Sequence, residues 1–274
     1  HLSLRRQRQM CIRDRMRTLI NFVSSAVVLC AASSAQAEET FIQIDIGRGD
    51  ARLPTYVMSN PEAIATIILL PGGDAGTGKI VDGKPASGNF LSRSRGRFFA
   101  ENFNVLVVYR ASDLSSLDYS YRVGKEHIAE LTKVISYAKQ TFSKPIWLVR
   151  TSRGTVSGAA TAIALGDSQV QGLVLTSSVT SKKTGAIATQ NIAGIKIPTL
   201  VVHHKYDACR ICVPHEASRI TAELTSAPIK KFIMIEGGSD PEGDPCEARH
   251  WHGFVNYEKE TVKIISDWIK NPQN

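Results

Sequence analysis

The chain has 274 residues, enough for one large α/β domain or two small ones, and its 43% hydrophobic and 21% charged residues are ordinary for a soluble globular protein. Its formal charge of +8 is concentrated at one end, because residues 1–17 hold six arginines against Asp14 and carry a net +5. The remaining +3 forms no dense Lys/Arg stripe, which argues against a nucleic-acid partner.

The N-terminal region has the pattern of a secretory signal peptide. From Met16 a short positive start leads into an apolar run and an Ala-Gln-Ala site that ends at Ala37. A transmembrane anchor is the alternative, but the run is short for a membrane span. We therefore expect cleavage after Ala37 and a periplasmic or secreted protein that is not membrane-bound. Residues 1–15 form a second basic leader, which we interpret as a non-native extension.

Residues 38–274 alternate strand-like and helix-like segments without a linker, which predicts a single domain. Segments 41–47 and 55–59 suggest two early strands, as an antiparallel hairpin. Continuous apolar runs are typical of strands buried on both faces, and helical periodicity marks the segments between them. The strand-like runs are 63–70, 104–110, 146–149, 170–178, 198–204 and 230–238, and the helical segments are 121–142, a segment from about Thr155, 215–225 and 254–270.

This alternation predicts an α/β fold with a mostly parallel central sheet and helices on both of its faces. Between Thr176 and Pro198 there is room only for a short excursion, so we expect a minimal cap.

The segment from Trp147 to Ala162 resembles a strand that enters a helix through a serine turn. Ser152 stands where a G-x-S-x-G elbow exposes its nucleophile beside a helix N-terminus. Gly154 supplies the small residue that a sharp turn needs, but Arg150 replaces the first glycine. A plain helix-capping serine is the alternative reading of Ser152.

Two further strand ends carry the partners that a serine nucleophile requires. Asp207 follows the strand at 198–204, and His252 follows the strand at 230–238. A neutral hydroxyl needs a base, a histidine can take and return its proton, and a carboxylate orients the imidazole. The order Ser152, Asp207, His252 is that of the α/β-hydrolase triad, with His250 as the alternative base.

The loop after the strand at 63–70 is rich in glycine. In this arrangement one oxyanion donor is the backbone N–H of the residue after the nucleophile, here Arg153, and the other comes from this loop. We predict Gly73 for that donor, with Asp74 as the alternative. The loop also resembles a phosphate cradle, but Ile80 stands where Ser or Thr should follow Lys79.

Cysteines provide the rival class of function. Cys209 and Cys212 form a C-x-x-C motif between a strand and a helix, as in a thiol-disulfide oxidoreductase. With nearby histidines and Cys246, a metal site is also conceivable. Because an exported protein more often oxidises such thiols, a disulfide from Cys209 or Cys212 to Cys246 is the simpler interpretation.

These motifs together resemble the α/β-hydrolase superfamily over essentially the whole of 38–274. The resemblance rests on LLPGG (69–73), TSRG (151–154), HHKYD (203–207) and HWHGF (250–254). The sequence is similar to small exported bacterial members of this superfamily, which have an S-R-G-T elbow, a D-x-C motif and a C…HGF segment. That resemblance implies a monomeric hydrolase of small-molecule carboxylic esters, acting through an acyl-enzyme without cofactor or metal, and a Cys209–Cys246 disulfide.

Arg150 departs from this pattern, because a large side chain should crowd the turn. Either its guanidinium escapes along the strand end, or the chain is a catalytically impaired binding protein. We hypothesise that Arg150→Gly keeps or raises activity.

Two other groups of side chains have open roles. The first group is four arginines, which either attract an anionic substrate or form a solvated face: Arg93, Arg95, Arg97 and Arg110. The second is four aromatic residues, which either line an acyl pocket or simply pack: Phe98, Phe99, Tyr109 and Trp251.

Overall fold

A computed structural model describes residues 37–274 of the chain. The predicted leader and signal peptide, with cleavage after Ala37, fall on residues before this range and lie outside the described part. Within the described residues, no helix combines the length and the apolar character that a membrane crossing requires.

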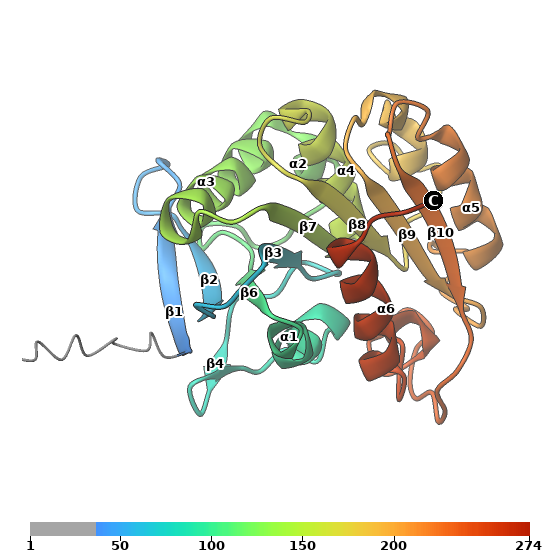
Figure 1. The fold of residues 1–274 in the computed structure, drawn as a ribbon, viewed down its shortest axis with the longest axis horizontal. Helices are drawn as coiled ribbons and strands as arrows, with labels where there is room; N and C mark the ends of the chain where they lie inside the picture. The colour runs from blue at the N-terminus through green and yellow to red at the C-terminus, as the bar shows by residue number, and fades with distance from the viewer. Residues whose placement is uncertain (1–36) are drawn as a thin grey trace, which may run out of the picture. The chain divides into compact units, whose positions relative to one another are not determined.

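The described residues build an eight-stranded sheet in the order β1-β2-β6-β3-β7-β8-β9-β10 (Figure 1). β1 and β2 form the predicted antiparallel hairpin, β2 is antiparallel to β6, and every later pairing is parallel. The prediction of a mostly parallel sheet is therefore confirmed. The strands are β1 (Glu38–Asp45), β2 (Arg52–Ser59), β3 (Ala65–Leu70), β6 (Phe103–Val108), β7 (Ile146–Thr151), β8 (Gly172–Thr176), β9 (Thr199–His204) and β10 (Lys230–Ile235), and β4 (Ile80–Val81) with β5 (Lys84–Pro85) makes a small separate ribbon.

Helices cover both faces of the sheet, as the apolar strand runs require. On one face, helices α3, α4 and α5 pack over a core that includes Leu131, Ala159 and Ile220. On the other face, α1 and α6 pack over a core that includes Phe98 and Trp268 (Figure 1). The helices are α1 (Phe90–Ala100), α2 (Tyr119–Val123), α3 (Lys125–Phe142), α4 (Gly154–Leu165), α5 (Pro214–Glu223) and α6 (Glu258–Lys270).

Three helical segments differ from the prediction. Helix α1 was not predicted, since Gly96 and its arginines mask the apolar positions that it buries. The segment 121–142 is two helices, because Gly124 is extended at φ −72°, ψ 156° and ends α2. The last helix begins at Glu258 rather than Phe254, whose left-handed backbone (φ 57°) follows a short 3₁₀ turn.

The excursion between β8 and β9 is short, as predicted. It forms two 3₁₀ turns, Ile187–Thr189 and Ile192–Gly194, whose first residues are buried. Its residues pack against α4 rather than over the cleft described below, so the cap is minimal.

Candidate active site

The turn between β7 and α4 places Ser152 at the carboxyl end of the central strands. Ser152 has φ +51°, a left-handed conformation that a non-glycine residue adopts only where its surroundings enforce it. Close contacts enforce it here. A Cβ on Gly154 would lie 2.6 Å from the Leu70 carbonyl oxygen, and one on Gly72 would lie 2.7 Å from the Ser152 Cβ.

Arg150, which replaces the usual first glycine, points away from this turn into the protein. Its side chain is fully buried beneath α4, and a Cβ on Gly158 would lie 2.6 Å from the Arg150 Cγ. Its Nη1 donates to the Ile68 carbonyl at 2.7 Å, while Nε and Nη2 have no partner among the described residues. Thus the absence of a side chain at Gly158 leaves room for the Arg150 side chain, which replaces the usual first glycine of the elbow. The expected crowding of the turn is not observed.

The volume of the Arg150 side chain and its charge should affect stability in opposite directions. Burial, with the positive charge of Arg122, lowers the pKa of Arg150 to about 9, so the group is charged and poorly compensated at neutral pH. Arg150→Met keeps the packing stem and removes that charge, so we expect unfolding in urea to show a gain of about 1–4 kcal/mol. Arg150→Gly instead leaves a cavity and should cost about 3 kcal/mol. Equal losses in both variants would contradict this account.

Asp207 and His252 meet directly although they lie far apart along the chain. His252 Nδ1 and Asp207 Oδ2 are 2.8 Å apart, and both residues are buried. The other carboxylate oxygen of Asp207 accepts the Cys209 backbone N–H at 2.9 Å. The Ser177 hydroxyl donates to the His252 carbonyl at 2.8 Å. The carboxylate and the imidazole are therefore both held in place.

Ser152 and His252 line one cleft of about 630 Å³. His252 Nε2 is buried without a hydrogen-bond partner among the described residues, and the Ser152 hydroxyl lies beside the Cys212 thiol. A direct Ser152–His252 hydrogen bond is therefore absent from the described residues. The cleft's other lining residues are Gly72, Gly73, Ser87, Gly88, Asn89, Phe90, Thr151, Glu242, Gly243, Cys246, Glu247, Ala248, Arg249 and Gly253.

His250, the alternative base, does not line this cleft. Its neighbour Trp251 stacks on His204 with ring centroids 4.9 Å apart and planes inclined by 6°. The aromatic pair anchors the segment that carries His252.

The close approach of Gly72 to Ser152 gives a sharp test of the turn. Gly72→Ala places a Cβ against the Ser152 side chain, and a displacement of about 1 Å at a reacting group can lower kcat about 10²-fold. Gly88→Ala is the matched control, because Gly88 lines the same cleft but has no atom within 4 Å of an added Cβ. Steady-state rates of both variants decide, and equal rates would show that Gly72 has no such role.

The loop from 71 to 76, called here the oxyanion loop because it holds the predicted donor Gly73, packs against this turn. Gly73 lines the cleft with φ +56°, a conformation that favours glycine. Asp74, the alternative donor, lies with its carboxylate 3.9 Å from both Arg110 and Arg153. Arg153 is exposed and follows Ser152 at the start of α4, so its side chain bridges the turn to the oxyanion loop.

Cys209 and Cys246 form a disulfide, which ties the Asp207 loop to the wall of the cleft. Cys212 is a buried free thiol. Burial, then the Asp207 carboxylate, raises its pKa well above the ordinary value. Ligand atoms of Cys209, Cys212 and His252 lie within 4.8 Å of one another, but Cys209 is already bonded to Cys246. Two free ligands remain, which is too few for a protein zinc site.

The four predicted arginines do not line the cleft: Arg97 is exposed, and Arg110 approaches Asp74 of the oxyanion loop. Arg93 pairs with Glu258 at 2.8 Å and donates to the carbonyls of Gly88 and Gly253, which joins two lining segments. Arg95 lies over the Tyr56 ring at 5.4 Å. The four predicted aromatic residues do not line the cleft. Phe90 does line it, and it was not predicted from the sequence because helix α1, which carries it, was not.

No family model and no curated protein matches the sequence. Several solved structures share its fold. A dienelactone hydrolase from Anabaena variabilis is 13% identical, with a TM-score of 0.61 over 87% of this chain and 100% of its own. An esterase from Pyrococcus furiosus is 15% identical, with a TM-score of 0.60 over 85% and 92%. An α/β serine hydrolase without a lid from Xanthomonas campestris is 15% identical, with a TM-score of 0.56 over 83% and 95%.

Proposed function

We propose that this chain, which has the α/β-hydrolase fold, is a serine hydrolase of carboxylic esters. The observation that carries the proposal is the 2.8 Å pair of Asp207 with His252, which lines the same cleft as Ser152 in its left-handed turn. The names of the fold's solved neighbours, which include esterases and a dienelactone hydrolase, support a hydrolytic reaction.

The reaction would proceed through an acyl-enzyme. The Ser152 oxygen attacks the ester carbonyl carbon as its proton passes to His252 Nε2, the buried acceptor without a partner. Asp207 holds Nδ1–H and stabilises the imidazolium. Backbone N–H groups of Gly73 and Arg153 receive the oxyanion, and His252 returns the proton to the leaving alcohol. Water then repeats these steps on the acyl group and releases the acid.

We propose that a rotation of the Ser152 side chain forms the Ser152–His252 hydrogen bond, which the described residues lack. The Ser152 hydroxyl lies beside the Cys212 thiol, and hydroxyl rotamers interconvert readily. Catalytic hydrogen bonds often tighten only when substrate binds.

The cleft favours small or polar acyl groups. Among its described lining residues, Phe90 is the only large apolar side chain, and glycines, hydroxyls and the charged Glu242, Glu247 and Arg249 make up most of the rest. Long alkyl chains need apolar walls. We expect kcat/KM for butyrate esters to exceed that for dodecanoate esters about tenfold or more. A rate that rises with chain length would contradict this substrate class.

A fluorophosphonate probe tests the nucleophile directly. The Ser152 oxygen would bond to phosphorus, fluoride would leave, and His252 would take the hydroxyl proton. Mass mapping should place the adduct on Ser152, and His252→Ala should abolish labelling. Labelling of another residue, or none at all in a folded protein, would overturn the proposal.

The rival interpretations predict other results. A thiol-disulfide oxidoreductase would use Cys209 and Cys212 as its pair, whereas Cys209 bonds to Cys246. An impaired binding protein was suggested by Arg150, whose side chain points away from the turn.

The disulfide also supports export, because such bonds persist in oxidising compartments. We propose a monomer that acts on a small molecule without a cofactor.

A further inference from the structure

A buried polar network lies beneath the oxyanion loop, outside the cleft. Arg122, His127, Glu130 and Ser157 are each at most 2% exposed. Charged side chains are almost never this buried unless they are paired. None of the four lines the cleft or takes part in the mechanism above. Their cost in desolvation calls for a role.

Arg122 connects this network to the oxyanion loop. Its Nη2 donates to the Gly73 carbonyl at 2.6 Å, its Nη1 to the Ser157 hydroxyl at 2.9 Å and its Nε to the Leu117 carbonyl at 3.3 Å. Every nitrogen of the guanidinium thus has a partner. Burial lowers the pKa of Arg122 to about 10, so the group is charged at neutral pH and its bonds are charge-assisted.

The hydrogens along the network can be assigned from the partners. Ser157 Oγ accepts from Arg122 and lies 2.9 Å from His127 Nε2, and His127 Nδ1 lies 2.9 Å from Glu130 Oε2. Burial lowers the pKa of His127, so its ring is neutral. Nδ1–H then donates to Glu130, and Nε2 accepts the Ser157 hydroxyl proton. The donations run in one direction from a cation to an anion, which strengthens each bond.

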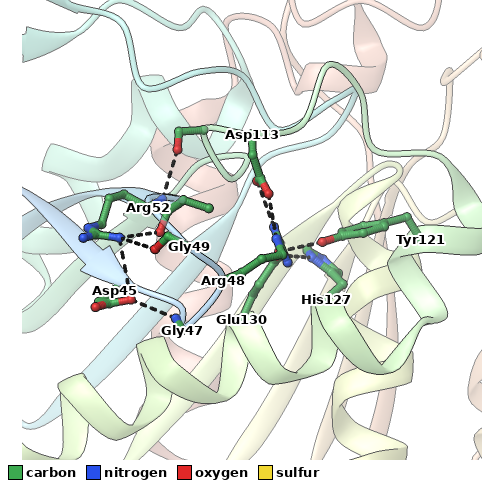
Figure 2. Close-up of polar contacts among 11 residues, drawn as sticks. Asp45, Gly47, Arg48, Gly49, Arg52, Asp113, Tyr121, His127 and Glu130 are labelled. Atoms are coloured by element: carbon green, nitrogen blue, oxygen red, sulfur yellow. Dashed lines mark hydrogen bonds and ion pairs between the residues drawn. The ribbon is translucent and has the colours of Figure 1, made fainter.

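Glu130 closes the network at its far end. Its Oε1 accepts from the Tyr121 hydroxyl at 2.6 Å and from Arg48 Nη2 at 2.7 Å. Burial alone would raise the pKa of Glu130, but the hydrogen bonds from His127, Tyr121 and Arg48 hold it below its ordinary value. Figure 2 shows Arg48 between Glu130 and Asp113, with Tyr121 and His127 beside the Glu130 carboxylate.

Ser157, His127 and Glu130 have the connectivity of a catalytic triad, but a substrate cannot reach them. Ser157 is fully buried in α4 and its hydroxyl is occupied by Arg122 and His127. Among the described residues, the network meets a residue that lines the cleft at one point, through the bond from Arg122 to the Gly73 carbonyl. Because a peptide unit is planar and trans, fixing that carbonyl also fixes the direction of the Asp74 N–H and the path of the loop through Gly73.

We propose that Arg122 is a positioning residue for the oxyanion loop, held in turn by Ser157, His127 and Glu130. This inference rests on the proposed function, since it concerns the same transition state. The guanidinium stabilises the loop with its N–H groups preorganised for a negative oxygen. Without it, the loop relaxes and the donors must reorganise during the reaction.

Variants at Arg122 and Ser157 test this role on a butyrate ester. An oxyanion donor is worth about 10²–10³ in kcat, so Arg122→Met should lower kcat about 10²-fold with KM nearly unchanged. Ser157→Ala, which removes the bonds to Arg122 and His127 without removing a charge, should lower kcat about tenfold. The kcat of Arg122→Lys should lie between those of these variants and that of wild type. A trifluoromethyl ketone, which adds to Ser152 and forms an oxyanion, should bind more weakly by the same factors as kcat/KM.

Thr161→Val is the matched control. Thr161 lies in α4, is buried, and donates to the Ser157 carbonyl, but no bond connects it to the oxyanion loop. Its kcat and ketone affinity should equal those of wild type even where its melting temperature falls. Unchanged kcat in folded Ser157→Ala and Arg122→Lys would overturn the inference while an inactive Ser152→Ala still supported the hydrolase. An inactive wild type would overturn both.

Discussion

Ser152→Ala is expected to lower kcat for ester hydrolysis by about 10⁴-fold or more, with a small change in KM. The hydroxyl supplies the nucleophile that forms the proposed acyl-enzyme, and the cleft retains its shape when one oxygen is removed. The measurement compares the kcat of the purified variant with that of wild type on a butyrate ester. Enzyme concentrations must be high enough to detect such a difference.

The partners of Ser152 should show the non-additivity of a group that acts as a unit. Asp207→Asn should lower kcat about 10⁴-fold, because an amide cannot stabilise the imidazolium or hold the correct tautomer. Adding Ser152→Ala should cause little further loss. His250→Ala is the control for the alternative base, since His250 does not line the cleft. Full activity in Ser152→Ala, or a larger loss of kcat in His250→Ala than in Asp207→Asn, would contradict the assignment of these residues.

Removing the disulfide by the double change Cys209→Ser and Cys246→Ser is expected to lower stability by about 4 kcal/mol. The bond closes a segment between residues 37 apart, and this value follows from the entropy of closing such a loop. For a domain of this size it corresponds to a fall in melting temperature of about 8–16 °C. Activity should fall as well, because the bond joins the loop of Asp207 to the cleft wall at Cys246.

Cys212→Ala is the control for the disulfide, since it removes a buried thiol without breaking a bond. It should lose only about 1 kcal/mol. In the unfolded chain 38–274, thiol titration should find one free thiol before reduction and three after it. A loss at Cys212 as large as that of the double variant would mean that Cys212 is the partner of Cys246.

The sequence determined the elements that local patterns encode. Six apolar runs predicted the parallel strands because strands covered on both faces have no polar positions to alternate. Polar residues at strand ends indicated Ser152, Asp207 and His252, since parallel strands bring their carboxyl ends to one edge. Helix α1 was missed because the residues it buries are scattered among arginines, and nothing local marks which face a helix will bury.

Tertiary structure decided where the side chains point. The sequence showed that Arg150 breaks the elbow pattern, but only the packing of α4 against β7 shows that Gly158 makes room for it. The network from Gly73 through Arg122 to Glu130 was also invisible in the sequence, since its members are spread over three helices and the loop that holds Gly73. Such contacts depend on how elements distant in the chain meet in space, which no local pattern encodes.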